Sequence, residues 1–334
     1  MQVFAGIEGG ASFSKGVLVS ENGAVLSTIE DAPSTNYLLV GSDVCNARIA
    51  EIIETLEKKA SIDSAVVVVG IGLCLSGCED ETANDEFARN LLQKYPNLAK
   101  RVVVGSDTLA AIMSANPKGG IVLISGTGSN SLLLNPDGKT KKCGGWGHML
   151  GDNGSGYWIV NKTIVAILNA EDNFNPLPYD IQGAKKLILE HFGMKEMIEI
   201  LKPAYINFSK TQFAAMCAKL AALANSGDGL CAHIFKEAGK ELGLHVVALF
   251  PFADKRLLEA EGGLTVVCCG SVFKSWNLLK DGFLSALGSS VKELTLLQLT
   301  RSAALGAAFF AAKTCGFQLP IDFDNTSVLY HHKL

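Results

Sequence analysis

The chain has 334 residues and a formal charge of −4, from 29 basic and 33 acidic residues, and 48% of its residues are hydrophobic. This composition excludes a disordered segment or a coiled coil, and the length predicts about two domains with large cores. An acidic balance without a run of basic residues argues against nucleic-acid binding and against a membrane-surface helix. We therefore expect a small-molecule partner, with no nucleic acid and no membrane.

The nine cysteines are odd in number and contain no C-x-x-C pair, which is typical of reduced thiols in a cytosolic protein. The first ten residues lack the basic flank and apolar stretch of a signal peptide. The longest uncharged stretch, 119–136, is interrupted by Gly, Ser, Asn and Pro and falls short of the about 20 apolar residues of a membrane helix. A soluble, cytoplasmic protein is expected.

In chain order, the first elements expected are strands. A strand from Val3 leads into a glycine turn at 8–12 and a second strand over 16–20. The Asn-Gly pair at 22–23 is the strongest short-range signal for a hairpin, and it joins the second strand to a third over 24–29. The chain is therefore expected to begin with three consecutive strands.

The next segment predicts one amphipathic helix and two buried strands. Continuous apolar runs at 65–75 and 101–106 are typical of strands covered on both faces, and a helix is expected from Thr108. Ser42 or Asp43 is expected to cap the amphipathic helix. Its buried face is predicted from residues spaced at i, i+4, i+7, i+8 and i+11: Cys45, Ile49, Ile52, Ile53 and Leu56.

From residue 121 the same plan starts again. A strand over 121–125, a glycine turn over 126–130, a strand over 131–134 and a hairpin at 135–138 repeat the order seen at the N-terminus. The two halves therefore look like copies. Two similar domains facing each other across a ligand-binding cleft are expected.

The remainder is predicted to be mainly helical, and the fold class is α/β with mixed sheets. We expect a smaller N-terminal domain over 1–117 and a larger one over 118–334, and we allow for the final residues to pack back on the N-terminal domain. A single strand is expected at 264–269. The helices are expected near 154–170, 181–192, 209–224, 229–250, 276–287 and 300–312.

The two glycine turns are candidate phosphate sites. Neither matches the P-loop pattern or the dinucleotide-binding pattern. Consecutive backbone N–H groups of a glycine-rich turn still bind an anion, and Ser12 and Thr127 add a hydroxyl donor in each turn. Either turn alone is more typical of an ordinary hairpin, but two matched turns favour phosphate binding.

The polar residues of two further segments leave alternatives open. Asp107 lies between a strand and a helix, so it is either a helix cap or a base aimed into the cleft, and Asp152 has the same two interpretations. The glycine-dense segment 144–156 encloses Trp146 and His148 and permits close backbone approach to a ligand. His148 has no companion at metal-ligand spacing beyond a neighbouring cysteine, so a structural histidine is the better interpretation.

A series of motifs covers nearly the whole chain in order: Ile7-Glu8-Gly9-Gly10, Ser34-Thr35-Asn36, Leu75-Ser76-Gly77, Ser106-Asp107, Ile124-Ser125-Gly126-Thr127-Gly128-Ser129-Asn130, Cys143-Gly144-Gly145-Trp146-Gly147-His148-Met149, Gly151-Asp152 and Gly270-Ser271. This series closely resembles the N-acetylglucosamine kinase family of animals. The resemblance implies two actin-like (ribonuclease H-like) ATPase domains, with mixed β-sheets flanked by helices and a ligand cleft between them.

The same resemblance implies a reaction. ATP would phosphorylate the 6-hydroxyl of N-acetyl-D-glucosamine, in amino-sugar salvage, in a homodimer. The family's catalytic aspartate falls on Asp107. The sugar-binding positions implied by the resemblance are Asn36, Ser76, Asp107, Ser129, Asn130, Gly145, Trp146, Asp152 and Tyr205.

The resemblance also implies how ATP and Mg²⁺ are held. No metal ligand is expected to come directly from the protein, and Glu8 is the candidate to organise Mg²⁺ through water. The nucleotide positions implied are Gly10, Ser12, Thr127, Ala215, Gly270, Ser271 and Ser275.

Two departures and two alternatives accompany the resemblance. Ala11 stands where the family usually has glycine, and Leu38 stands where a tryptophan is common. One alternative is a related ATPase activator of an acyl-CoA dehydratase, with an iron–sulfur cluster at a dimer interface, and the other is a kinase for another N-acylated hexosamine. Asn36, Asp107 and Asp152 suit the hydroxyls of a sugar and favour a sugar kinase over the activator.

Overall fold

The computed structural model describes residues 1–10, 13–62, 66, 68–76, 78, 80–116, 118–300, 302–320 and 326–334. The expected nucleotide contact Ser12, the neighbouring Ala11 and the side chain of Leu38 lie outside the described residues. Within the described residues, no helix is long and apolar enough to cross a membrane.

The described strands form two mixed sheets, one of five strands in the order β3-β2-β1-β4-β5 and one of six in the order β11-β10-β9-β6-β7-β8. In each sheet an antiparallel three-stranded meander is followed by two parallel strands. The predicted internal repeat and the α/β fold class are therefore confirmed. The strands are β1 Val3–Gly9, β2 Phe13–Ser20, β3 Val25–Pro33, β4 Val68–Leu75, β5 Arg101–Gly105, β6 Gly120–Ser125, β7 Ser129–Leu134, β8 Thr140–Gly144, β9 Leu264–Cys269, β10 Glu293–Leu299 and β11 Thr326–Lys333.

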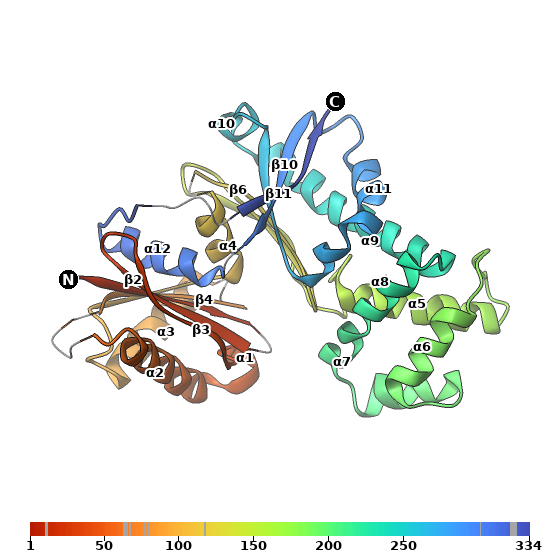
Figure 1. The fold of residues 1–334 in the computed structure, drawn as a ribbon, viewed down its shortest axis with the longest axis horizontal. Helices are drawn as coiled ribbons and strands as arrows, with labels where there is room; N and C mark the ends of the chain where they lie inside the picture. The colour runs from red at the N-terminus through yellow and green to blue at the C-terminus, as the bar shows by residue number, and fades with distance from the viewer. Residues whose placement is uncertain are drawn as a thin grey trace.

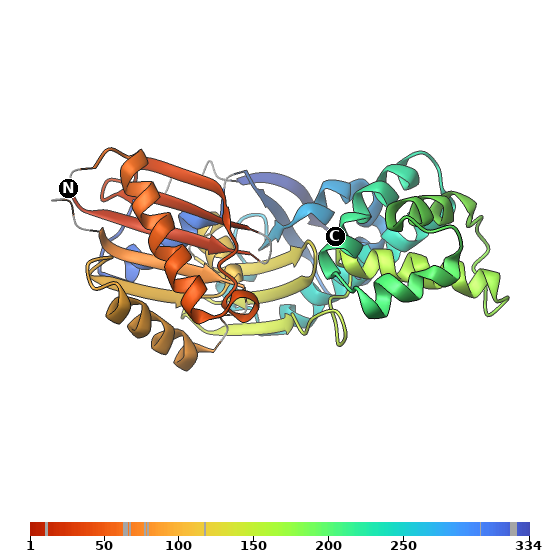
Figure 2. The ribbon, with the colours of Figure 1, turned by 90° about the horizontal axis from the view of Figure 1, so that it is seen from below.

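The helices flank these sheets, and those of residues 156–225 gather at the end of the molecule remote from the N-terminus (Figures 1 and 2). Four short segments, η1 Met197–Ile200, η2 Lys202–Ile206, η3 Phe250–Phe252 and η4 Ser271–Ser275, have 3₁₀ or, for η2, π geometry. The α-helices are α1 Tyr37–Val40, α2 Ser42–Lys59, α3 Glu81–Lys94, α4 Asp107–Ala115, α5 Gly156–Glu171, α6 Gln182–Phe192, α7 Lys210–Ala215, α8 Cys217–Asn225, α9 Gly229–Leu249, α10 Lys255–Leu258, α11 Trp276–Leu287 and α12 Ala304–Thr314.

The sheets and helices are arranged in layers around separate hydrophobic cores. Helices α2 and α3 cover one face of the first sheet, and the five residues of the predicted apolar face of α2 are all buried there. Helices α12 and α4 lie between the two sheets, and α9 packs on the far face of the second sheet, in one core with α5 and α11 (Figure 1). Each sheet is thereby covered by hydrophobic cores on both faces.

Helix α12 packs unusually close to its neighbours because small residues meet backbone. A Cβ added at Gly6 of β1 would lie 2.0 Å from the Ala304 oxygen, and one at Gly72 of β4 would lie 1.8 Å from the Ala307 oxygen. The C-terminal helix therefore returns to the first sheet, whereas β11 joins the second sheet beside β10. The domain boundary between residues 117 and 118 stays a prediction.

The structure corrects several expectations. Helix α2 is preceded by Gly41, and no side-chain cap is found there among the described residues, so the predicted capping by Ser42 or Asp43 is wrong. Met216 separates α7 from α8 where one helix was expected, and α12 begins at Ala304, later than expected. Strands β10 and β11 were missed altogether. Leucine-rich β10 has good helix propensity, and its pairing with β9 overrides that preference.

Candidate active site

Three loops of the first sheet converge at the ends of its strands. The Ser76 N–H donates to the Gly9 oxygen over 2.8 Å, and the Ser34 hydroxyl donates to the Gly10 oxygen over 2.8 Å. The Asn36 N–H in turn donates to the Ser34 hydroxyl over 3.2 Å. The structure therefore brings together the first glycine turn and two of the expected sugar contacts, Asn36 and Ser76.

Asp107 is the first residue of α4, and Ser106 alone separates it from β5. The cap of this helix is Ser106, whose hydroxyl accepts from the Leu109 N–H over 3.4 Å. Asp107 Oδ1 accepts from the Thr108 N–H over 2.8 Å. Since Ser106 takes the capping position, the Asp107 carboxylate stands at the positive end of the helix, where a negative charge is favoured.

The charges of Glu8 and Asp107 raise the pKa of the same two thiols, those of Cys74 and Cys269. Burial is the main cause that raises the pKa of Cys74 on β4, and the charges of Asp107 and Glu8 raise it further. Burial likewise raises the pKa of Cys269 at the end of β9, again with Glu8 and Asp107 contributing. One thiol belongs to each sheet, so the two carboxylates lie in one region between the sheets. All nine cysteines lie among the described residues, and they are thiols rather than halves of a disulfide.

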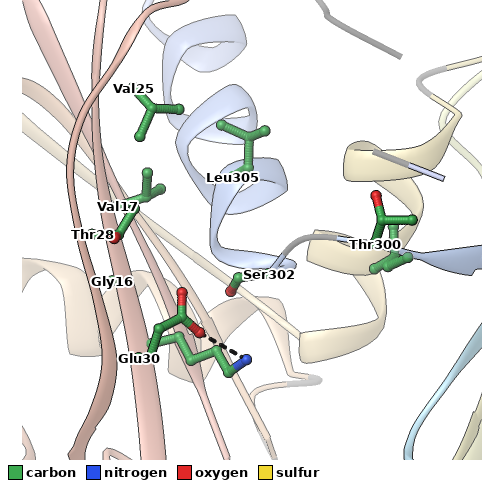
Figure 3. Close-up of a pocket in the computed structure, with 10 residues that line it drawn as sticks. Gly16, Val17, Val25, Thr28, Glu30, Thr300, Ser302 and Leu305 are labelled. Atoms are coloured by element: carbon green, nitrogen blue, oxygen red, sulfur yellow. Dashed lines mark ion pairs between the residues drawn. The ribbon is translucent and has the colours of Figure 1, made fainter. Parts of the chain in front are cut away.

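Glu8 also ties β1 to the chain that enters α12. Its Oε2 accepts from the Ser302 hydroxyl over 3.0 Å and from the Ala303 N–H over 3.1 Å. Ser302 lines a pocket of about 650 Å³ between the β2–β3 hairpin and the segment before α12, where Lys15 pairs with Glu30 over 3.0 Å (Figure 3). Among the described residues that line this pocket there is no expected sugar or nucleotide contact, so we do not assign it as the active site.

The second glycine turn is packed against Gly270. The Gly156 N–H donates to the Gly126 oxygen over 2.8 Å, which fixes the turn to the start of α5. Gly270 has φ +104°, and a Cβ added there would lie 2.2 Å from the Ser125 oxygen. The backbones of β9 and of the turn therefore approach to a distance that only glycine allows. Backbone N–H groups of such a glycine turn are suited to bind the phosphates of a nucleotide.

The remaining nucleotide positions follow from these elements. Ser271 is the exposed first residue of η4, and Ser275 ends η4 directly before α11. Ala215 is exposed at the end of α7. The backbone of the preceding Ala214 lies near Gly156, since a Cβ on Gly156 would be 3.5 Å from the Ala214 oxygen. Helix α7 thus adjoins the glycine turn.

Asp152 is held against the strand that follows the turn. Its side chain is only 4% exposed, and its backbone has φ +59°, which is uncommon for a residue other than glycine. Oδ1 accepts from the Ser129 N–H over 3.1 Å, and Oδ2 lies 2.6 Å from Lys210 Nζ. The structure therefore joins two expected sugar contacts, Asp152 and Ser129, and adds Lys210.

Asn130 and Gly145 also lie together, because a Cβ on Gly145 would be 2.6 Å from Asn130 Oδ1. Asn130 lines a groove of about 780 Å³ between the two sheets. Ser106 and Thr108, which stand on either side of Asp107 in the chain, line the same groove. The two remaining expected sugar contacts, in contrast, are largely open to solvent: Trp146 is 69% exposed and Tyr205 is 81% exposed.

His148 is part of an aromatic cluster. Its ring stacks on Phe208 at 4.8 Å and meets the edge of Tyr157 at 5.2 Å. Burial lowers the pKa of His148 and the Lys210 ammonium lowers it further, while Asp152 acts in the opposite direction. These contacts agree with the structural histidine expected from the sequence.

Lys210 was missed by sequence reasoning. It carries no motif, and it lies far along the chain from Asp152. The fold of the helical segment brings it to the turn, and only the capping Ser209 before it marks the start of α7 in the sequence.

Two ribonuclease H-like sheets with the same order of meander and parallel strands, flanked by helices, define the actin-like ATPase fold. Solved structures share it: a candidate N-acetylglucosamine kinase from Chromobacterium violaceum has a TM-score of 0.71 at 21% identity, covering 92% of this chain and 98% of that chain. A ROK hexokinase from Thermus thermophilus has a TM-score of 0.58 at 16% identity, covering 93% and 99%.

The family model of the BadF/BadG/BcrA/BcrD ATPases matches residues 5–311, and the chain belongs to this family. One curated relative, the N-acetylmuramic acid/N-acetylglucosamine kinase of Clostridium acetobutylicum, is 25% identical over 94% of this chain and 100% of its own length. Another, the N-acetyl-D-glucosamine kinase of Dictyostelium discoideum, is 28% identical over 93% of this chain and 98% of its own length.

Proposed function

We propose that the protein transfers the terminal phosphoryl group of ATP to the 6-hydroxyl of N-acetyl-D-glucosamine. Both curated relatives named above are kinases of N-acetylated sugars, and each aligns over nearly the whole chain. The observation that carries the proposal is the position of Asp107, at the end of β5 and between two residues that line the groove with Asn130. A carboxylate there is suited to accept a proton from a sugar hydroxyl.

In this mechanism Asp107 is the catalytic base. Its carboxylate takes the proton of the 6-hydroxyl as the new oxygen–phosphorus bond forms and the bond to ADP breaks. ATP supplies the phosphoryl group, with Mg²⁺ as its counterion. The backbone around Gly10, Thr127 and Gly270 would hold the phosphates, and Ser271, Ser275 and Ala215 the nucleoside. Positioning and charge neutralisation dominate such a transfer.

The sugar would be oriented by polar groups from both halves. Asn36 and Ser76 offer hydrogen bonds from the first half, and Ser129, Asn130, Gly145 and Asp152 from the second, with Trp146 and Tyr205 at the exposed rim. Closure around the sugar would exclude water, which otherwise competes as acceptor. We further propose that Glu8 organises Mg²⁺ through water, and that the protein is a homodimer of the cytoplasm, as the resemblance implies.

The related ATPase activator is not favoured, because both curated relatives are sugar kinases. N-acetylmuramic acid, which the name of the Clostridium relative includes, is the second acceptor to test.

The proposal is tested by Asp107→Asn, with turnover measured in a coupled ADP assay with N-acetylglucosamine. Loss of a positioned base is expected to lower kcat by about 10²- to 10⁴-fold. The matched control is Asp137→Asn, since Asp137 lies in the hairpin between β7 and β8 and pairs with Lys139 over 3.0 Å. The control should keep wild-type turnover. A kcat for Asp107→Asn close to that of the control would overturn the assignment.

A further inference from the structure

Lys210 and Asp152 form an ion pair in the second half of the site. Lys210 is the first residue of α7, and its Nζ lies 2.6 Å from Asp152 Oδ2. The lysine side chain is 30% exposed, whereas the carboxylate is 4% exposed. A buried carboxylate is costly without an opposite charge, and the Lys210 ammonium offsets part of the cost of burying Asp152.

The ion pair lies directly over Gly128, the last residue of the second glycine turn before β7 begins. A Cβ added to Gly128 would stand 2.8 Å from Lys210 Nζ, 2.9 Å from Asp152 Oδ1 and 3.1 Å from Asp152 Oδ2. The charged groups therefore occupy the space that a side chain at 128 would take. The carboxylate is thus held from two sides, by the Ser129 N–H on Oδ1 and by the Lys210 ammonium on Oδ2.

The backbone of Asp152 has φ +59°, in the left-handed region, which an aspartate occupies at some conformational cost. Among the residues that the structure describes, the Lys210 ammonium and the Ser129 N–H hold its carboxylate. Without the ammonium, the Ser129 N–H remains of these two contacts.

Lys210 could instead act on the nucleotide, since it shares α7 with Ala215. Its ammonium, however, is already engaged at 2.6 Å by a buried carboxylate, and its position over Gly128 is on the Ser129 side of the turn. The contacts therefore connect Lys210 to Asp152 rather than to the nucleotide.

Resting on the proposed function, we propose that Lys210 is a positioning residue for the sugar: it fixes the Asp152 carboxylate in the orientation that binds the acceptor. Lys210 acts through Asp152 and sets sugar affinity. The affinity for ATP does not depend on it.

The test is Lys210→Met, which keeps the length of the side chain and removes its charge. A hydrogen bond to a charged group is worth about 10- to 100-fold in affinity, so the Kd for N-acetylglucosamine, measured by calorimetry without nucleotide, should rise by about that factor. The KM for ATP should stay within about threefold, and Lys210→Arg should restore most of the sugar affinity because it restores the charge.

Two controls complete the experiment. Lys185→Met removes a lysine of similar exposure, 28%, that pairs with Glu171 in the helical segment, and it should leave the sugar Kd unchanged. In an Asp152→Asn background Lys210→Met should cause little further loss, because the lysine acts through that carboxylate.

The outcomes are distinguishable. A wild-type protein that neither binds nor phosphorylates the sugar contradicts the proposed function itself. A functional wild type with an unchanged sugar Kd in folded Lys210→Met, or a raised ATP KM with normal sugar binding, overturns the role of Lys210. Full and additive losses in Lys210→Met and Asp152→Asn also overturn it. Thermal melts establish that each variant is folded, and Lys210→Gln, which also removes the charge, replaces Lys210→Met if that variant does not fold.

Discussion

Gly270→Ala should damage the second glycine turn in a measurable way. Gly270 has φ +104° and ψ 160°, a region that is essentially restricted to glycine, and holding alanine there costs about 1–3 kcal/mol. The new Cβ would also meet the Ser125 oxygen at 2.2 Å. The Ser125 oxygen belongs to the backbone, and the Cβ is fixed by the backbone of residue 270. A side-chain rotation therefore cannot relieve the overlap, which adds about 1–3 kcal/mol.

The expected sum of about 2–6 kcal/mol is a large part of the 5–15 kcal/mol by which proteins are commonly stable. At about 2–4 °C per kcal/mol, the melting temperature should fall by at least about 4 °C. Since relief of the overlap must move the chain at Ser125 and Gly126, the KM for ATP should rise as well.

The matched control for this variant is Gly138→Ala in the hairpin before β8. Gly138 has φ +86°, and a Cβ there would meet no described atom within 4 Å, so only the backbone cost of about 1–2 kcal/mol is expected. Differential scanning fluorimetry and ATP titrations on both variants separate strain from overlap. If Gly270→Ala and Gly138→Ala have the same melting temperature and Gly270→Ala keeps the wild-type KM for ATP, the assignment of close packing at the turn is refuted.

The remaining predictions concern the sugar loop, the cap of α4 and the buried thiols. Gly145→Ala would place a Cβ 2.6 Å from Asn130 Oδ1 and should raise the KM for the sugar but not for ATP; equal effects on both would contradict the grouping of Asn130 with Gly145. Ser106→Ala removes the cap beside Asp107 and should cost about 1 kcal/mol of stability together with part of kcat, whereas Asp80→Ala, at the cap of α3, should cost stability alone; equal kcat values in the two variants would refute the link. Burial raises the pKa of Cys45 and of Cys217 from an ordinary value of 9.0 to about 12. Below pH 9 both thiols are protonated whether the chain is folded or not, but between pH 9 and 12 only the unfolded chain loses these protons, so stability should fall as the pH rises. Urea titrations of wild type and of a Cys45→Ala, Cys217→Ala variant check this, and an identical alkaline slope in both would disprove it.

Most of the first sheet could be predicted from the sequence because its turn and periodicity patterns are local. An Asn-Gly pair marks the β2–β3 hairpin, and apolar periodicity marks α2, whose predicted face is buried. The repeated order of strand, turn and strand likewise predicts that the two halves have similar sheets. Local patterns of this kind do not depend on the rest of the fold.

Strands β10 and β11 depend on partners elsewhere in the chain. The segment Glu293–Leu299 is rich in leucine and is ambiguous between helix and strand, and β11 is a largely polar edge strand. Only pairing with β9 and β10 decides both. The start of α12 was also missed, because Glu8 of β1 meets the chain at Ser302 and Ala303, a contact that no local pattern indicates.

Part of the candidate site could likewise be predicted from local sequence, and part depends on the fold. The glycine turns and the resemblance predicted Asp107, Asp152 and their neighbours as site residues. The role of each residue depends on the geometry of the fold. Ser106 takes the capping position at α4, so Asp107 is not the cap, and its other interpretation is a base aimed into the cleft. Lys210 reaches Asp152 only through the folding of the helical segment, so it could not be predicted from the sequence.

The most direct test of the central claim is ADP release by the wild-type protein with Mg-ATP, measured with N-acetylglucosamine, N-acetylmuramic acid, N-acetylmannosamine, glucose and no sugar, with the product identified by phosphorus NMR. For an N-acetylglucosamine kinase we expect the fastest turnover with N-acetylglucosamine, a 6-phosphate product and little hydrolysis without sugar. ADP release at the same rate with and without every sugar would contradict it.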